Sequence, residues 1–147
     1  MPAIPVRPRP DLNPRPPRFQ PPPGATDTHF HIFGPEDRYP FVQERRFTPP
    51  DASVEEYVHL HRTLGLSRAV LVQPSSYGTD NRRQLEAAKA MDFPTRLIVV
   101  VPPGVSDREL DGLYAAGARG VRFNPSQPGS LPLSELERYA ERLDAKR

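Results

Sequence analysis

Apolar and polar positions along the chain predict alternating strands and helices from residue 24 onward. Short apolar or β-prone runs have the length of buried strands, and each is followed by a stretch with helical spacing of apolar residues. The expected strands cover 25–33, 68–75, 96–102 and 120–123. The expected helices cover 53–64, 80–91, 106–116 and a segment that begins near Pro132 or Ser134. The pattern is therefore (βα)4.

Two Ser-x-x-Glu sequences, at Ser53 and Ser106, predict where the first and third helices begin, because this spacing forms a capping box. Strands that alternate with helices in this way form parallel sheets with right-handed crossovers. Four units make half of a (βα)8 barrel, or a small open sheet. In either α/β architecture ligands bind at the carboxyl ends of the strands.

Residues 1–23 differ from the rest, since they contain ten of the 21 prolines and four arginines. Proline fixes φ and removes the N–H donor, so this segment is expected to be an extended arm in front of a domain at 24–147. One interpretation is a Pro-Arg ligand for an aromatic-lined groove on a protein partner. The other, which the low specificity of such runs favours, is an arm that lies along its own domain.

Composition excludes several classes of protein. The net charge is +2, and the arm accounts for the positive excess, so the domain offers no basic face for nucleic acid. The chain has no cysteine, which excludes disulfides, thiolate metal sites and a cysteine nucleophile. Its apolar runs are far shorter than the roughly 20 residues that span a membrane. We therefore expect a cytoplasmic protein with no membrane or nucleic-acid partner.

Two histidine pairs differ in their predicted element. His29 and His31 lie two residues apart on the first expected strand, so their rings point to the same face and can share one metal ion or one substrate oxygen. His59 and His61 lie in an expected helix, where positions i and i+2 do not face each other. The first pair is the candidate functional pair.

Polar residues also follow the second and fourth strands. Ser75 and Tyr77 follow the second strand, and Asp80 or Asn81 is placed to cap the next helix. Arg122 and Asn124 share one face at the end of the fourth strand. An arginine there suits a substrate carboxylate, or else forms an internal ion pair. Ser75, Tyr77, Arg122 and Asn124 are the predicted substrate-binding residues.

Taken together, three motifs resemble the amidohydrolase superfamily. They are DTHFH at 27–31, VQPSSYGTDN at 72–81 and GVRFN at 120–124, in the family's order along residues 24–147. Within the superfamily the chain is most similar to the lactone-hydrolysing branch that includes 2-pyrone-4,6-dicarboxylate hydrolase. This resemblance implies the N-terminal half of a TIM barrel. It also implies that His29 and His31 polarise a lactone carbonyl, that Ser75 contacts substrate and that Arg122 grips a carboxylate.

The resemblance also implies what the chain lacks. The family's general base is an aspartate at the end of the eighth strand, so this chain alone is expected to be inactive. Arg122 stands near the place where binuclear members carry a bridging lysine, so the expectation is no metal or one zinc-like divalent ion on His29 and His31. Phe47 replaces an expected tyrosine, and no second arginine follows GVRFN.

Two functions remain open at this point. The first is a hydrolase for a lactone or related cyclic ester of a carboxylic acid, of which this chain is an incomplete half. The second is a non-catalytic half-barrel scaffold whose arm binds a protein partner. Open sheet edges at the first and fourth strands predict self-association in either case. Few charges or prolines protect those edges, which favours the incomplete enzyme.

Overall fold

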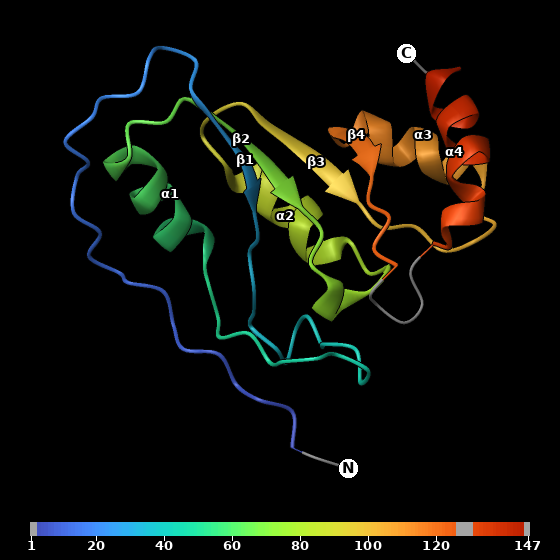
Figure 1. The fold of residues 1–147 in the computed structure, drawn as a ribbon, viewed down its shortest axis with the longest axis horizontal. Coiled ribbons are helices and arrows are strands. Elements are labelled where there is room, and N and C mark those ends of the chain that lie inside the picture. Colours follow the sequence, from blue (N-terminus) through green and yellow to red (C-terminus); the bar gives the residue numbers. More distant parts are fainter. Residues whose placement is uncertain (1–2, 126–130, 146–147) are drawn as a thin grey trace.

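The computed structural model describes residues 3–125 and 131–145 and contains one parallel four-stranded sheet (Figure 1). Neighbouring strands pair in the order of the sequence, so each connection crosses over through a helix. The strands are β1 (Thr26–Phe30), β2 (Arg68–Val72), β3 (Thr95–Val99) and β4 (Ala118–Val121). The predicted βα alternation is confirmed.

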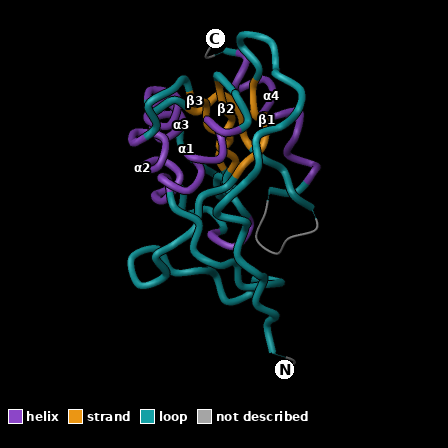
Figure 2. Tube along the Cα trace, turned by 90° about the vertical axis from the view of Figure 1, so that its left-hand side faces the viewer, coloured by secondary structure: helices purple, strands orange, loops and turns teal. Residues whose placement is uncertain are grey.

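A helix follows each strand, and the first three lie together on one side of the sheet (Figure 2). The last helix stands beside β4, at the edge of the sheet (Figure 1). The helices are α1 (Val54–Thr63), α2 (Arg82–Ala90), α3 (Asp107–Ala115) and α4 (Leu136–Asp144), with short 3-10 turns η1 (Ser75–Tyr77) and η2 (Leu133–Glu135). None of the helices in the described ranges is long and apolar enough to cross a membrane.

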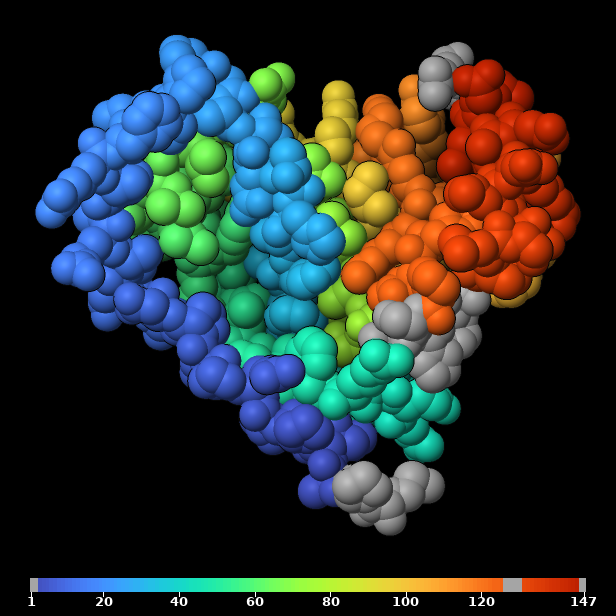
Figure 3. Space-filling model, viewed as in Figure 1, coloured from blue at the N-terminus to red at the C-terminus, as the bar shows by residue number. Residues whose placement is uncertain are grey.

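The hydrophobic core fills the space between the sheet and the helices. Ala69, Leu71, Leu97 and Val99 alternate along β2 and β3, and each is at most 2% exposed. Because side chains alternate across a strand, the residues between them point to the opposite face. Figure 3 shows that face with the strands visible and no helix over them. The sheet thus has one covered and one open face, as half of a barrel wall does.

The ends of the elements agree with the capping signals but not with every apolar run. Both predicted capping boxes are present, with Ser53 bonded to Glu56 at α1 and Ser106 bonded to Glu109 at α3. β4 ends at Val121, two residues before the expected end, so Arg122 lies just beyond the strand. The strand expected at 25–33 ends at Phe30 because the residues after it find partners outside the sheet.

The proline-rich arm lies along its own domain. Val6 forms a parallel bridge with Thr48, and the Arg9 guanidinium lies 2.6 Å from the Glu56 carboxylate on α1. In Figure 1 the arm runs around the α1 side of the molecule before it enters β1. These contacts match the favoured sequence interpretation. Val6 and Phe19 are nevertheless more than 70% exposed.

Candidate active site

The structure brings His29 and His31 together at the carboxyl end of β1. Their ring centroids are 4.9 Å apart, with one ring edge-on to the other. His29 is exposed, whereas His31 is partly buried. The register between β1 and β2 shifts between Asp27 and Phe30, so the pairing is irregular where His29 lies.

The ring of His31 is fixed by the neighbouring strand. Its Nδ1 lies 2.7 Å from the carbonyl oxygen of Val72, at the end of β2. A carbonyl only accepts, so Nδ1–H donates and the neutral ring keeps a lone pair on Nε2. Burial lowers the pKa of His31, and the nearby charges of His29 and Arg122 lower it further against the opposing effect of the Val72 bond. At neutral pH, Nε2 is therefore the ring atom left to act on a ligand.

Arg122 reaches the same place from β4. Its guanidinium donates to the carbonyl oxygen of Gln73, 2.8 Å away, across the end of β3. The side chain is partly buried, and burial lowers its pKa. None of the ion pairs among residues 3–125 and 131–145 includes Arg122. The internal ion pair that the sequence allowed is therefore not found in this part of the chain.

Ser75 and Asn124 are close in sequence to Gln73 and Arg122. Ser75 begins η1, two residues after Gln73, whose carbonyl holds Arg122. Asn124 follows Arg122 by two residues, and both Ser75 and Asn124 are partly exposed. Their substrate-binding roles stay predictions.

Tyr77 packs among aromatic side chains. It is 2% exposed and clusters with Tyr39, Phe41 and Phe33. Its hydroxyl accepts a hydrogen bond of 2.8 Å from the backbone N–H of Gly34. The structure thus gives Tyr77 a packing role, and its predicted substrate contact stays a prediction.

We expect alkaline pH to loosen the loop cluster around Tyr77. Burial raises the pKa of Tyr77 to about 12, whereas an unfolded tyrosine ionises near its ordinary value. The folded state thus holds the proton that the unfolded state loses, and stability falls as the pH rises from about 10 to 12. Unfolding by urea at a series of pH values should show this loss. Tyr77→Phe should reduce the slope above pH 10, and an unchanged slope would contradict the assignment.

Two further sequence predictions concern the second βα loop and the second histidine pair. Asn81 occupies the position before α2, but its side chain bonds the backbone of Val100 and caps nothing. Asp80 instead accepts from the backbone N–H of Arg82 and pairs with its guanidinium. His59 is exposed while His61 is buried, so these two rings point apart, as the helical spacing predicts.

The candidate site has two imidazoles and no third ligand within the described ranges. No group of three His, Cys, Asp or Glu residues among them could hold a metal ion. The nearest strand carboxylate, Asp27, accepts from the hydroxyl of Tyr57 at 2.9 Å and from the backbone N–H of His29. Burial and this carboxylate raise the pKa of Tyr57. If a metal ion is bound here, His29 and His31 would supply two of its ligands, and the metal role of this pair stays a prediction.

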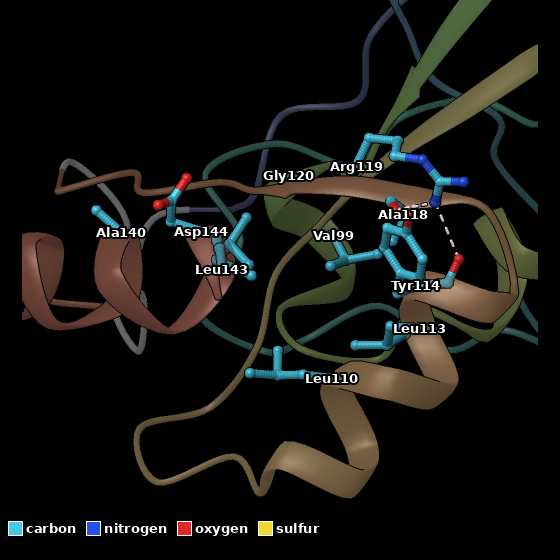
Figure 4. A pocket seen from close by; sticks show the side chains of 11 residues that line it. Val99, Leu110, Leu113, Tyr114, Ala118, Arg119, Gly120, Ala140, Leu143 and Asp144 are labelled. Carbon is cyan, nitrogen blue, oxygen red and sulfur yellow. Dashed lines mark hydrogen bonds between the residues drawn. The ribbon is translucent and has the colours of Figure 1, made fainter. Parts of the chain in front are cut away.

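Cavities flank both outer strands. One of about 560 Å³ lies beside β1, where His29, His31 and Phe33 face Arg7 and Pro8 of the arm. The other, of about 540 Å³, lies between α3, β4 and α4, and Figure 4 shows the leucines that line it. These leucines are Leu110, Leu113 and Leu143. A cavity therefore lies at each edge of the sheet.

Comparison with known proteins gives matches over most of the chain. Residues 26–145 match the family model described as Amidohydrolase. The chain is 45% identical over 112 residues to a 2-pyrone-4,6-dicarboxylate hydrolase from Comamonas testosteroni, covering 76% of this chain and 37% of that protein. It is 41% identical over 127 residues to a 4-sulfomuconolactone hydrolase from Hydrogenophaga intermedia, covering 84% and 42%.

A solved structure of a protein of this kind is also similar to the chain. A probable 2-pyrone-4,6-dicarboxylic acid hydrolase from Acinetobacter baumannii superposes with a TM-score of 0.73 and 28% identity, over 83% of this chain and 46% of that one. The chain spans about two fifths of the length of the curated relatives it matches. Its four βα units correspond to about half of the barrel in these proteins. On the family match and the identity to these relatives, the chain belongs to the amidohydrolase family.

Proposed function

We propose that the chain supplies the N-terminal part of the active site of a hydrolase that opens a lactone bearing an acidic group. The observation that carries this proposal is Arg122, a partly buried cation beside His31 that makes no ion pair with any described residue. A desolvated guanidinium is costly unless an anion binds it. A substrate carboxylate or sulfonate is such an anion.

The relatives support this substrate class. Their names include a pyrone dicarboxylate and a sulfomuconolactone, each of which joins an acidic group to a lactone ring. The Acinetobacter baumannii structure holds citric acid, which is also a carboxylate. Arg122 and Asn124 would bind the acidic group of the substrate, and Ser75 would contact the ring from the end of β2.

The histidine pair would polarise the lactone carbonyl. Attack of water converts this carbonyl to a tetrahedral oxyanion, and a positive group or donor next to the oxygen lowers the barrier. A protonated His31 would donate from Nε2. The neutral ring would instead offer its Nε2 lone pair to a divalent ion, which supplies Lewis acidity when bound. His29, 4.9 Å away, belongs to either arrangement.

The general base is expected to come from outside this chain. Of the two carboxylates nearest the strand ends, Asp27 is bonded to Tyr57 and Asp80 is paired with Arg82. Neither is free to take a proton from the attacking water. In the proposed reaction the base takes a proton from water and the hydroxide bonds to the lactone carbon. The ring C–O bond then breaks, and the proton held by the base passes to the leaving oxygen to give an open hydroxy acid or its tautomer.

Hydrolysis should therefore require additional chain. We expect the 147-residue chain alone to leave 2-pyrone-4,6-dicarboxylate and 4-sulfomuconolactone intact. A joined enzyme, made by fusing this chain to the part of the Comamonas testosteroni relative that follows the matched region, should open one of these rings. Loss of ring absorbance measures the reaction. The added part alone is the control, and hydrolysis by the 147-residue chain alone would contradict the assignment of the base.

A non-catalytic scaffold is the second candidate. Val6 and Phe19 on the arm are 74% and 73% exposed, so apolar side chains are available to a protein partner between the prolines. The outer strands β1 and β4 also present unpaired edges among the described elements, which would allow self-association. A joined enzyme that folds but opens neither lactone would favour this candidate.

A further inference from the structure

The backbone that follows β1 is held by partners outside the sheet. Pairing between β1 and β2 ends at Phe30, one residue before His31. Beyond it, the N–H of Phe33 donates to the carbonyl of Ala52, and the N–H of Gly34 donates to the Tyr77 hydroxyl. From His31 onward, the backbone is therefore not held in place by pairing with β2.

Gln84 provides the partner for Ile32, the residue directly after His31. Its Nε2 donates to the Ile32 carbonyl at 2.8 Å, and its Oε1 accepts from the Ile32 N–H at 3.3 Å. The amide replaces the strand partner that Ile32 would have if β1 continued. Gln84 is 1% exposed and Ile32 is fully buried. A buried backbone group that loses its partner destabilises its local arrangement, because no water replaces the bond.

The position of Ile32 determines where the imidazole of His31 can lie. The backbone of His31 is joined to β1 on one side and to Ile32 on the other, and its ring reaches Val72 on the next strand. We propose that Gln84 is a positioning residue, which holds Ile32 so that the ring of His31 stays on the Val72 carbonyl beside Arg122. Its importance for catalysis rests on the proposed function.

Two more buried amides support this assignment, because they act on the neighbouring strand ends in the same way. Asn81 bonds both the N–H and the carbonyl of Val100, just beyond β3, at 3.1 and 2.7 Å. Gln73 donates to the carbonyls of Gly78 and Asp80, which closes the loop that carries Ser75. Residues 73–84 therefore supply side-chain amides to the ends of β1, β2 and β3.

The tautomer of His31 tests the proposal without any substrate. In the 147-residue chain at a pH well above that at which histidine ionises, nitrogen-15 NMR of the ring should show the proton on Nδ1. Gln84→Met keeps the length of the side chain and removes both bonds to Ile32. We expect the ratio of the Nδ1–H form to the Nε2–H form to fall about fivefold, which corresponds to the loss of about one net hydrogen bond.

A matched variant on the same helix separates positioning from general loss of stability. Leu85 is partly buried against the core, so Leu85→Ala should lower the melting temperature and leave the His31 tautomer unchanged. Gln84→Glu keeps the shape and, ionised at the high pH of the measurement, replaces the donor to the Ile32 carbonyl with a negatively charged acceptor, so it should shift the tautomer in the same direction. A single Nδ1–H form in every folded Gln84 variant would overturn the proposal, whether or not the joined enzyme proves active.

Discussion

Arg122→Met should lower kcat/KM of the joined enzyme by a factor of about 10² to 10³, mainly through a higher KM. Truncating one member of a buried charge pair costs about 2–5 kcal/mol, and each 1.4 kcal/mol is a factor of ten. In the proposed site the second member of the pair would be the acidic group of the substrate, since no described carboxylate forms an ion pair with Arg122. Steady-state hydrolysis over a range of lactone concentrations measures both constants.

Arg119 supplies the matched control, because it lies on β4, shortly before Arg122, in a different environment. Its side chain is exposed and donates to the carbonyl of Tyr114 on α3 (Figure 4). We expect Arg119→Met to change kcat/KM less than about twofold, as for surface substitutions in general. Arg122→Lys keeps the positive charge but loses the planar guanidinium, so its kcat/KM should lie between those of Arg122→Met and Arg119→Met. Equal effects at both arginines would remove Arg122 from the site.

Features that depend on local sequence were predicted well. The capping boxes at Ser53 and Ser106 need only four consecutive residues, and both form as expected. The pairing of His29 with His31 follows from the two-residue repeat of a strand, and their rings are neighbours even though the strand ends between them. The rings of His59 and His61 point apart because residues two positions apart on a helix do not face each other.

Features that depend on a distant partner were not predicted. The packing role of Tyr77 is one example, because its hydroxyl accepts from the N–H of Gly34, 43 positions away. Asn81 sits where a capping residue is expected, yet its amide bonds Val100 in preference to the helix. Gln84 has the sequence appearance of a solvent-facing residue in a charged helix, and only the course of the chain after β1 explains its burial.

The roles of the two candidate histidines should separate when each is replaced by glutamine in the joined enzyme. His31 is partly buried, held by Val72 and next to Arg122, whereas the exposed ring of His29 has no such anchor among the contacts described. His31→Gln should lower kcat by a factor of about 10² to 10³, the effect of removing one group that stabilises an oxyanion. His29→Gln should cost roughly tenfold, in the range of a supporting contact.

His59→Gln is the control for this pair, since His59 is exposed on α1 and should leave kcat within about twofold. The comparison is made at saturating lactone, so that weaker binding does not enter. Losses at His29 as large as those at His31 would contradict the unequal roles, because they would mean that the two imidazoles act as one unit. Repeating the series with added zinc then locates the cause, since a shared ion would make both losses depend on the metal concentration.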